Sequence, residues 1–412
     1  MAGKILMGQK ELQRSHVLKK VQCGEMKKTE AAKQLQISYR QLQRIYARYL
    51  EEGDAGLPHR NQGRAANNRI QAEIQERALK AYRERYFDFG PTLAAEHLLR
   101  SEKIRVSEET LRQWLLGAGL WQRKRRGNPY RSRRERRACF GELVQFDGSR
   151  HDWFEGRRGK CCLMNMVDDA TGMSFSMLFE EETTEAAMRV LWGWIQRYGI
   201  PQALYCDRKN AFVSNREPSV EEQLAGIEPK SHFERACEKL GIEVIRAYSP
   251  QAKGRVERNH AVYQDRFIKE LRLAGVGTIE EANKFLEEKY LPVVNGKFAR
   301  VPACLEDGHI PLGRVDLGEI LCFEEQRVVS RDFVIGFKRR LFQILPKSRP
   351  RPHPGEKVTV RVRLDGSLDV YFKSTKLSCK EIPIEMKKEE ARIFKNNLPI
   401  QDISALGRHT TF

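Results

Sequence analysis

The sequence has no long hydrophobic run and no organised set of cysteines. No apolar stretch approaches the roughly 20 residues that span a bilayer, and the N-terminal MAGKILMGQKELQ lacks the apolar core of a secretion signal. The nine cysteines form no CxxC pair and show no zinc-ligand spacing with histidine. These absences argue against membrane insertion, secretion and a zinc module, and they favour a protein of the reducing cytoplasm.

Charge, by contrast, is abundant and unevenly distributed. Lys and Arg number 74 against 55 Asp and Glu in 412 residues, a net charge of +19. Residues 1–140 hold 31 basic and 15 acidic side chains, a net +16, whereas residues 141–412 hold 43 and 40, a net +3. This asymmetry predicts that the N-terminal third binds a polyanion and that the rest is a different kind of domain. A surface that is basic only for solubility is the alternative.

The first 66 residues have the pattern of a helix-turn-helix DNA-binding domain. A short amphipathic helix over residues 27–35 is followed by a turn at Gln36, and Ser38 is a natural N-cap for a second helix over Tyr39–Glu52. The turn has Gln36 where glycine is common. The second helix carries the side chains expected to contact DNA, which are Arg40, Gln41 and Arg44. An ordinary helical hairpin is the alternative.

Residues 67–122 repeat this arrangement and predict a second helix-turn-helix domain. Helices are expected over 70–86 and 92–100, and Ser107 caps a third over Glu108–Gly117. A basic linker follows at 123–140, with nine Arg or Lys and one Glu between residues 123 and 137. Such a linker can lie along a phosphate backbone, or it can be merely solvated. The DNA contacts expected there are Arg125, Arg126, Arg133 and Arg134.

From residue 141 strands and helices alternate, which predicts an α/β layer domain over residues 141–300. Asp147 ends the strand LVQFD, Asp207 ends the strand ALYCD, and Glu257 lies in the first turns of a helix after SPQAKGR. Strand ends and helix starts that meet at one sheet edge form a site. Convergent carboxylates repel one another unless a cation is present, and hard oxygen ligands suit Mg²⁺ or Mn²⁺. Taken singly, each acid is weak evidence, because an Asp at a strand end is more often a turn residue or a helix cap and a Glu in a first turn often just complements the helix dipole.

The pattern of expected secondary structure changes again in the C-terminal part of the sequence. Residues 301–325 read as connecting chain, residues 326–380 as about five short strands with a basic surface, and residues 381–412 as a polar tail. The strands predict a small barrel. Its expected DNA contacts are Lys338 and Arg339.

Four stretches resemble the catalytic core shared by retroviral integrases and DDE transposases. They are VQFDGSRHDWF, CLMNMVDDATGMSF, LYCDRKNAF and YSPQAKGRVERNHAVYQDRF. Within this group, the sequence looks most like bacterial insertion-sequence transposases of the ISNCY type. The resemblance implies a multidomain protein with tandem all-α helix-turn-helix modules, an α/β RNase H-like catalytic core and a small all-β SH3-like barrel.

The resemblance also implies roles for individual residues. Asp147, Asp207 and Glu257 would form a catalytic triad that binds two Mg²⁺ or Mn²⁺ ions, which clamp the attacking and leaving oxygens of a phosphoryl transfer. Lys253, Arg255 and Arg258 would contact phosphates or bases near the scissile end. Asp168 and Asp169 are expected to form a structural turn rather than to act as rival ligands. The sequence departs from the family pattern in one spacing: 49 residues separate Asp207 and Glu257, more than in most retroviral integrases.

The activity implied is transposition. The protein would bind the terminal inverted repeats of a mobile element, hydrolyse a phosphodiester to free a 3′-hydroxyl and transfer that strand into target DNA without a covalent protein–DNA intermediate. It would act as a homo-oligomer on double-stranded DNA, in the bacterial cytoplasm and associated with the nucleoid, with no membrane partner. Two alternatives remain, a DNA-binding regulator derived from a transposase and an RNase H-like nuclease that only cuts.

Overall fold

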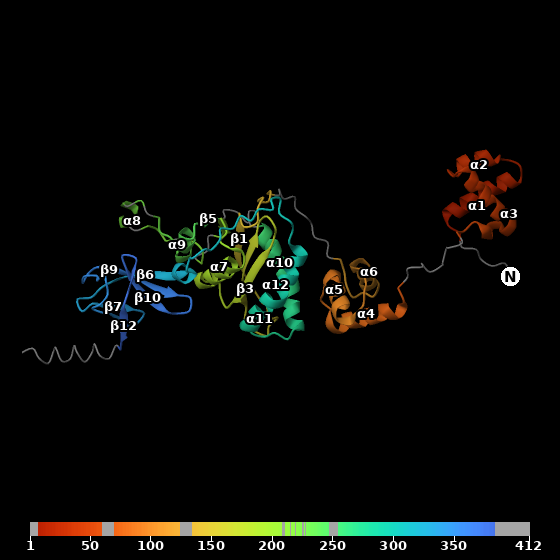
Figure 1. The fold of residues 1–412 in the computed structure, drawn as a ribbon. Helices are drawn as coiled ribbons and strands as arrows, with labels where there is room; N and C mark the ends of the chain where they lie inside the picture. The colour runs from red at the N-terminus through yellow and green to blue at the C-terminus, as the bar shows by residue number, and fades with distance from the viewer. Residues whose placement is uncertain are drawn as a thin grey trace, which may run out of the picture. The chain divides into compact units, whose positions relative to one another are not determined.

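The computed structural model describes residues 7–59, 70–123, 134–207, 211–214, 216–218, 220–224, 226, 228–246 and 254–383. The chain divides into one compact unit over Met1–Arg125 and another over Arg126–Phe412 (Figure 1). Within the described ranges, no helix is both long enough and apolar enough to cross a membrane.

Residues 7–59 fold as a small helical bundle. Its elements are α1 (Gln9–Gln22), α2 (Lys28–Gln34), α3 (Tyr39–Glu52) and a short 3-10 turn, η1 (Gly53–Gly56). Leu18 and Leu42 are fully buried in its core. The helix α3 begins where expected because the Ser38 hydroxyl accepts the N–H of Gln41 at 3.2 Å. Gln36 has a φ of 54°, so it takes the left-handed conformation that glycine usually supplies in this turn.

Residues 70–123 form a second helical bundle. It consists of α4 (Ala72–Arg85), α5 (Pro91–Glu102) and α6 (Glu108–Gly117). Pro91 occupies the first turn of α5, where its missing N–H costs no hydrogen bond. The Ser107 hydroxyl accepts the N–H of Thr110 at 3.1 Å and starts α6 at the expected residue. Both helix-turn-helix patterns are therefore present as helices with the predicted caps.

The centre of the second unit is a mixed sheet. Its strands are β1 (Val144–His151), β2 (Cys161–Asp168), β3 (Ser174–Phe179), β4 (Ala203–Cys206) and β5 (Glu243–Arg246). Their order is β3-β2-β1-β4-β5, with antiparallel pairing from β1 to β3 and parallel pairing from β1 through β4 to β5. This order and these directions are those of the expected RNase H-like fold. The strand β1 runs four residues past the expected end at Asp147, because residues 148–151 pair with residues 161–164 of β2.

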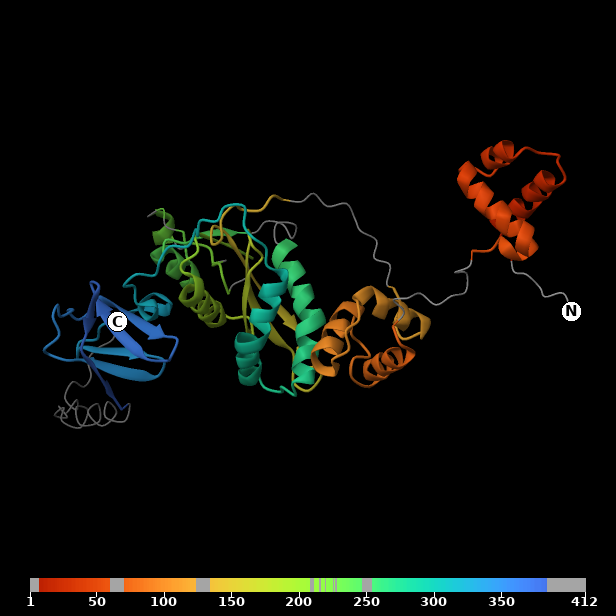
Figure 2. The same cartoon turned by 45° about the vertical axis from the view of Figure 1, so that its right-hand side comes forward.

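Helices cover both faces of this sheet (Figure 2). They are α7 (Thr184–Tyr198), α9 (His232–Lys239), α10 (Gly254–Leu273), α11 (Ile279–Phe285), a π-helical turn η3 (Leu286–Tyr290) and α12 (Leu291–Phe298). The short helix α8 (Val220–Leu224) does not cover the sheet, and both of its end residues are exposed. On one face, Ser149 of β1 accepts a hydrogen bond from Gln264 of α10, and Asn295 of α12 bonds to Ser174 of β3. On the other face, Phe175 packs closely against α7. The helices α11 and α12 were not expected from the sequence.

After α12 the chain runs back alongside residues 138–140, near the start of the second unit. The Cys304 N–H donates to the Ala138 carbonyl at 3.0 Å, and the Gly308 N–H donates to the Phe140 carbonyl at 2.7 Å. Ile310 and Ile200 exchange backbone hydrogen bonds of 2.8 and 2.9 Å. We call this pairing of residues 304–310 with residues 138–140 and 200 the seam. Part of the segment expected to be a linker is therefore packed onto the core.

The C-terminal β-domain starts before the expected boundary at residue 326. The short helix α13 (Leu317–Ile320) leads into it, and its first strand begins at Cys322, four residues before that boundary. Its strands are β6 (Cys322–Val328), β7 (Val334–Phe337), β8 (Arg340–Ile344), β9 (Lys357–Arg363), β10 (Leu368–Phe372), β11 (Thr375–Leu377) and β12 (Cys379–Ile382). They form two sheets, β11-β10-β9-β6 and β12-β8-β7, that share one hydrophobic core. Among the described strands, hydrogen bonding does not close these sheets into a single barrel, so the expected SH3-like barrel is observed as two sheets around a common core.

Candidate active site and nucleic-acid surfaces

Two of the three candidate acids lie on neighbouring chains of the sheet, Asp147 within β1 and Asp207 directly after β4. Phe146 of β1 pairs in parallel with Cys206 of β4, so Asp147 and Asp207 are the next residues along adjacent chains. Adjacent strands lie about 4.8 Å apart. Both carboxylates are half-buried. The mixed sheet thus places Asp147 and Asp207 next to each other, although Asp147 lies within β1 and not at the strand end that the sequence predicted.

The face on which Asp147 lies is fixed by its neighbours in β1. Gln145, Asp147 and Ser149 share one face because side chains alternate along a strand. The Gln145 Oε1 accepts the backbone N–H of Val256 at 3.1 Å, and the Ser149 hydroxyl accepts from Gln264 at 3.1 Å. Since both of these partners belong to α10, Asp147 lies on the sheet face that α10 covers.

The third acid, Glu257, lies in the first turn of α10 and is exposed. Val256, directly before it, is bonded to β1. Asn259, two residues later, accepts a 2.8 Å hydrogen bond from Asn165 of β2, and Asn165 is the residue paired with Asp147 across β1 and β2. The turn that carries Glu257 is therefore anchored on both sides to the strands that border Asp147.

The described residues contain no group of three or more His, Cys, Asp and Glu side chains arranged to hold a metal ion. Residues 247–253, which lead into α10, lie outside the described residues, and so does Lys253. The elements that carry the three acids are neighbours, but the three side chains do not form such a group within the described residues, and their action as a metal-binding triad stays a prediction.

Two buried polar residues of this site were missed by sequence reasoning. Gln145 and Asn165 have no exposed surface. The Asn165 Oδ1 accepts a 2.8 Å hydrogen bond from Ser176, and its Nδ2 donates to Asn259. Buried polar groups are almost always hydrogen-bonded. The signal was a lone amide inside each of the apolar runs LVQF and CLMNMV.

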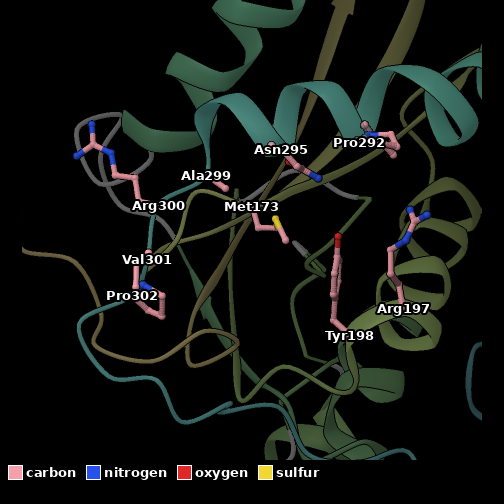
Figure 3. Close-up of a pocket in the computed structure, with 11 residues that line it drawn as sticks. Met173, Arg197, Tyr198, Pro292, Asn295, Ala299, Arg300, Val301 and Pro302 are labelled. Carbon is pink, nitrogen blue, oxygen red and sulfur yellow. The ribbon is translucent and has the colours of Figure 1, made fainter.

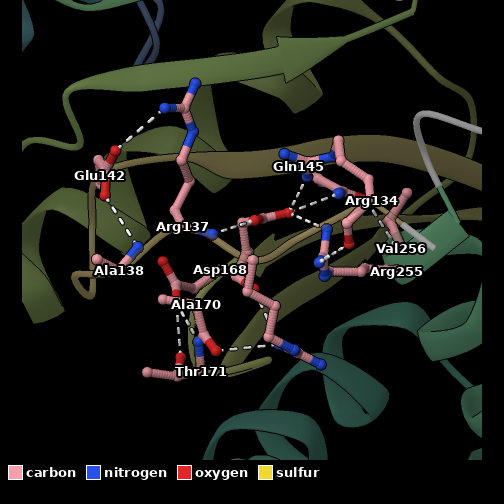
Figure 4. A network of polar contacts seen from close by, with 12 residues as sticks. Arg134, Arg137, Ala138, Glu142, Gln145, Asp168, Ala170, Thr171, Arg255 and Val256 are labelled. Atoms are coloured by element: carbon pink, nitrogen blue, oxygen red, sulfur yellow. Dashed lines mark hydrogen bonds and ion pairs between the residues drawn. The ribbon is translucent and has the colours of Figure 1, made fainter. Parts of the chain in front are cut away.

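Asp168 and Asp169 are both fully buried at the end of β2. Asp168 accepts from the Gly141 N–H at 3.0 Å and from the N–H and hydroxyl of Thr171 at 2.7 Å, so it holds the expected turn. Burial raises the pKa of the Asp168 carboxyl. Asp169 reaches further, because its carboxylate bonds to three residues outside the turn, which Figure 4 labels: Arg134, Gln145 and Arg255.

Two of the arginines expected to contact DNA are held by Asp169. Arg255 donates to it at 2.5 Å, and Arg134 is its second ion-pair partner. The Arg255 side chain is only 16% exposed, and burial lowers the pKa of its guanidinium. Arg258, by contrast, is exposed on α10. These contacts give Arg134 and Arg255 a structural partner within the protein.

The other expected DNA contacts lie on exposed surfaces where the structure describes them. Arg40, Gln41 and Arg44 are exposed on α3, opposite the buried face of that helix. Lys338 and Arg339 are exposed at the tip that joins β7 to β8. The remaining three, Arg125, Arg126 and Arg133, lie outside the described residues.

A separate hollow of about 560 Å³ opens between the end of α7 and the end of α12. Figure 3 shows Met173, Tyr198 and Arg300 on its walls. None of the three candidate acids lines it. It is therefore distinct from the candidate active site.

Two helix-turn-helix bundles followed by a mixed sheet with the strand order β3-β2-β1-β4-β5 define the class of DNA-binding proteins with an integrase-like core. Two family models, both described as homeodomain-like domains, match residues 9–58 and 41–115. The chain is 37% identical over 398 residues to "Putative transposase y4bF" of Sinorhizobium fredii (strain NBRC 101917 / NGR234), covering 96% of this chain and 86% of the relative. The chain belongs to this transposase family.

Two further similarities accompany this one. The "Transposase for insertion sequence IS1202" of Streptococcus pneumoniae is 29% identical over 364 residues, which cover 79% of this chain and 76% of the relative. Among solved structures, the catalytic core domain of BIV integrase is 24% identical with a TM-score of 0.27, covering 36% of this chain and 85% of that one.

Proposed function

We propose that this protein is the DDE transposase of an insertion sequence and that Asp147, Asp207 and Glu257 are its catalytic residues. It would bind the terminal inverted repeats, hydrolyse a phosphodiester to free a 3′-hydroxyl and transfer that strand into target DNA. The observation that supports the proposal is that Asp147 in β1 and Asp207 after β4 follow paired residues of adjacent strands, and that the first turn of α10, which carries Glu257, is hydrogen-bonded to β1 and β2.

The donor atoms of these three acids fit Mg²⁺ or Mn²⁺. Two half-buried aspartates and an exposed glutamate offer only carboxylate oxygens, the ligands these hard cations prefer. Two bound ions would activate the attacking oxygen and stabilise the leaving oxygen of an in-line phosphoryl transfer. The protein itself would position the acids, since Gln145 and Asn165 hold the first turn of α10 against β1, which carries Asp147, and against its neighbour β2.

We propose that DNA binding is divided among the modules. The domains would be helix-turn-helix modules at 1–66 and 67–122, a basic linker at 123–140, the catalytic core at 141–300, a linker at 301–325, a β-domain at 326–380 and a tail at 381–412. The exposed α3 side chains Arg40, Gln41 and Arg44 would read the terminal repeat. Arg258 and the linker arginines would contact phosphates.

The β-domain offers a further argument for phosphate contact. Lys338 and Arg339 have φ values of 45° and 61° at a two-residue hairpin tip. Asn and Gly are the residues that adopt this conformation at least cost. The choice of two basic residues there is explained by their charge and exposure rather than by turn preference, which supports a role in DNA binding.

The assembly we propose is a homo-oligomer, because joining two element ends needs a dimer or larger complex. Its site of action would be the bacterial cytoplasm, at the nucleoid, where its double-stranded DNA substrates lie.

The test is cleavage and strand joining on the element's own end DNA with Mg²⁺ or Mn²⁺. Glu257→Gln keeps the side-chain size and removes the charge that a cation needs. We expect it to bind the ends normally and to lose about three orders of magnitude in both reactions, equivalent to several kcal/mol of transition-state stabilisation. Glu280→Gln, an exposed first-turn glutamate of α11, is the matched control and should react normally.

Two outcomes would favour the alternatives. If the wild-type protein binds the ends and neither cuts nor joins with either cation, it is a DNA-binding regulator derived from a transposase. If it cuts but never joins, it is a nuclease.

A further inference from the structure

We infer that Asp169 is a positioning residue for Glu257, connecting the basic linker and the strand β1 to the first turn of α10. This inference rests on the proposed function. Asp169 is not one of the three candidate acids, and it has no exposed surface through which to reach DNA or a metal ion.

The Asp169 carboxylate accepts hydrogen bonds from widely separated parts of the chain. Its Oδ1 accepts from Gln145 of β1 at 3.0 Å, from Arg255 of α10 at 2.5 Å and from Arg134 of the linker. Its Oδ2 accepts the backbone N–H of Arg137 at 2.8 Å. A turn residue needs only local partners, whereas these donors come from the linker, the central strand and the helix that carries Glu257 (Figure 4).

The first connection to α10 runs through Gln145. An ionised carboxylate can only accept hydrogen bonds, so Gln145 must turn its amide NH₂ toward Asp169. Its carbonyl oxygen then faces the opposite way and accepts the backbone N–H of Val256 at 3.1 Å. The first N–H groups of a helix have no partner within the helix. Asp169 therefore fixes the amide that caps α10 from outside, one residue before Glu257.

The second connection runs through Arg255. Its Nη1 donates to Asp169, and its Nη2 donates to the backbone carbonyl of Arg134 at 3.1 Å. Arg255 is thereby held between the carboxylate and the linker, with its backbone two residues before Glu257. Both connections converge on the same turn, so the carboxylate controls its position from two sides.

A consequence for the site follows from the charges. Replacing Asp169 by Asn keeps the shape of the side chain but leaves two guanidiniums without their counter-charge and places an NH₂ group among donors. The turn of α10 would then lose its outside cap and its anchor together. Residues that orient metal ligands from behind typically change metal affinity or activity by about 10- to 100-fold when they are removed.

The experiment compares three variants of the full chain. Asp169→Asn removes the charge. Gln145→Met removes the hydrogen bond to Val256 and leaves both arginines paired with Asp169. If Asp169→Asn does not fold, Gln145→Met tests whether this connection positions the first turn of α10. Asp168→Asn is the matched control, because this neighbouring buried carboxylate bonds only to Gly141 and Thr171 in the contacts described above. The readouts are thermal unfolding, end-DNA binding, cleavage rate at saturating DNA against Mn²⁺ concentration, and amide hydrogen exchange at the start of α10.

We expect Asp169→Asn and Gln145→Met to bind end DNA normally, to cleave at least about tenfold more slowly at saturating DNA and to need more Mn²⁺ for half-maximal rate. Exchange over residues 255–258 should be faster in both variants. Asp168→Asn should unfold at a lower temperature without these changes.

The inference is overturned if Asp169→Asn keeps the wild-type exchange at the start of α10. It is equally overturned if Asp168→Asn slows cleavage as much as Asp169→Asn does, since that pattern would reflect stability alone. The exchange measurement needs no activity. If the wild-type protein neither cuts nor joins, the proposed function fails, while exchange still decides whether Asp169 positions α10.

Discussion

Polar side chains without exposed surface lie in the middle of the catalytic sheet, where apolar ones would cost less to bury. Asn165 bonds to both Ser176 and Asn259, and Gln145 bonds to both Asp169 and Val256. A buried polar group that lacks its partner costs about 1–3 kcal/mol. Each of these amides therefore ties α10 to the sheet in one register, which apolar packing alone would specify less strictly.

The exposed arginine side chains of α3 lead to a prediction about DNA recognition. Arg40→Ala and Arg44→Ala should each weaken binding to the terminal repeat by about 1–3 kcal/mol and should relax its sequence preference, because both side chains lie on the exposed face of α3. Competition binding with repeat and scrambled DNA measures both effects. Lys284→Ala, which removes one exposed charge from α11, is the control and should change neither.

The candidate acids were chosen from the sequence because each was expected to end a strand or start a helix, and their catalytic role stays a prediction. Their supporting residues could not be found in this way, because the partners are far apart along the chain. Asn165 and Asn259 are 94 residues apart, and Asp169 and Arg255 are 86 apart. A sequence without an alignment contains no signal that pairs such residues. For the same reason Arg134 and Arg255 were expected to contact DNA, whereas their charges are engaged by Asp169.

Element by element, helix starts were predicted well and element extents less well. The predicted caps Ser38 and Ser107 each accept a hydrogen bond from the first turn that follows, which is local chemistry visible in the sequence. The polar end of β1 was not foreseen, since residues 148–151 become a strand only by pairing with β2. The β-domain likewise has more strands than expected, because short edge strands carry little periodicity.

The contact between β6 and α9 predicts how stability responds to pH. Glu324 accepts from Lys239 at 2.6 Å and from Arg361 at 2.8 Å. Burial raises the pKa of the Glu324 carboxyl, but the two cations outweigh it, so its pKa in the folded protein lies below the ordinary value of 4.5. Such a carboxyl stabilises the folded state above its unfolded pKa and loses that contribution as the pH falls through its folded pKa.

Glu324→Gln should therefore lower the free energy of unfolding by about 2 kcal/mol at neutral pH. The difference from the wild-type protein should shrink steadily once the pH falls below about 4.5. Urea unfolding followed by tryptophan fluorescence at several pH values measures this. Glu325→Gln is the control, because that more exposed carboxylate pairs only with Arg327 in the described contacts, and its loss should cost less than about 1 kcal/mol. Equal losses in both variants would contradict the prediction.

For the whole molecule, the uneven charge predicts the salt dependence of DNA binding. Each phosphate that a cation neutralises lowers the slope of log K against log salt by about 0.9. Replacing Arg125 and Arg126 together by Gln should therefore make that slope shallower by about 2 and should weaken binding to repeat and unrelated DNA alike. A titration over a range of NaCl concentrations with both DNAs measures it. An unchanged slope would mean that this part of the linker does not touch phosphates.

The seam has a consequence for how such proteins evolve. The chain enters the catalytic core at residues 138–140 and leaves it along residues 304–310, and these two stretches are hydrogen-bonded to each other. The two connections thus begin about 5 Å apart, whatever the width of the sheet between them. Domains whose ends are adjacent can be inserted or exchanged without separating their neighbours. Because its two ends are adjacent, the core is a unit of this kind, and a change in the modules on either side of it need not separate the strands β1 to β5.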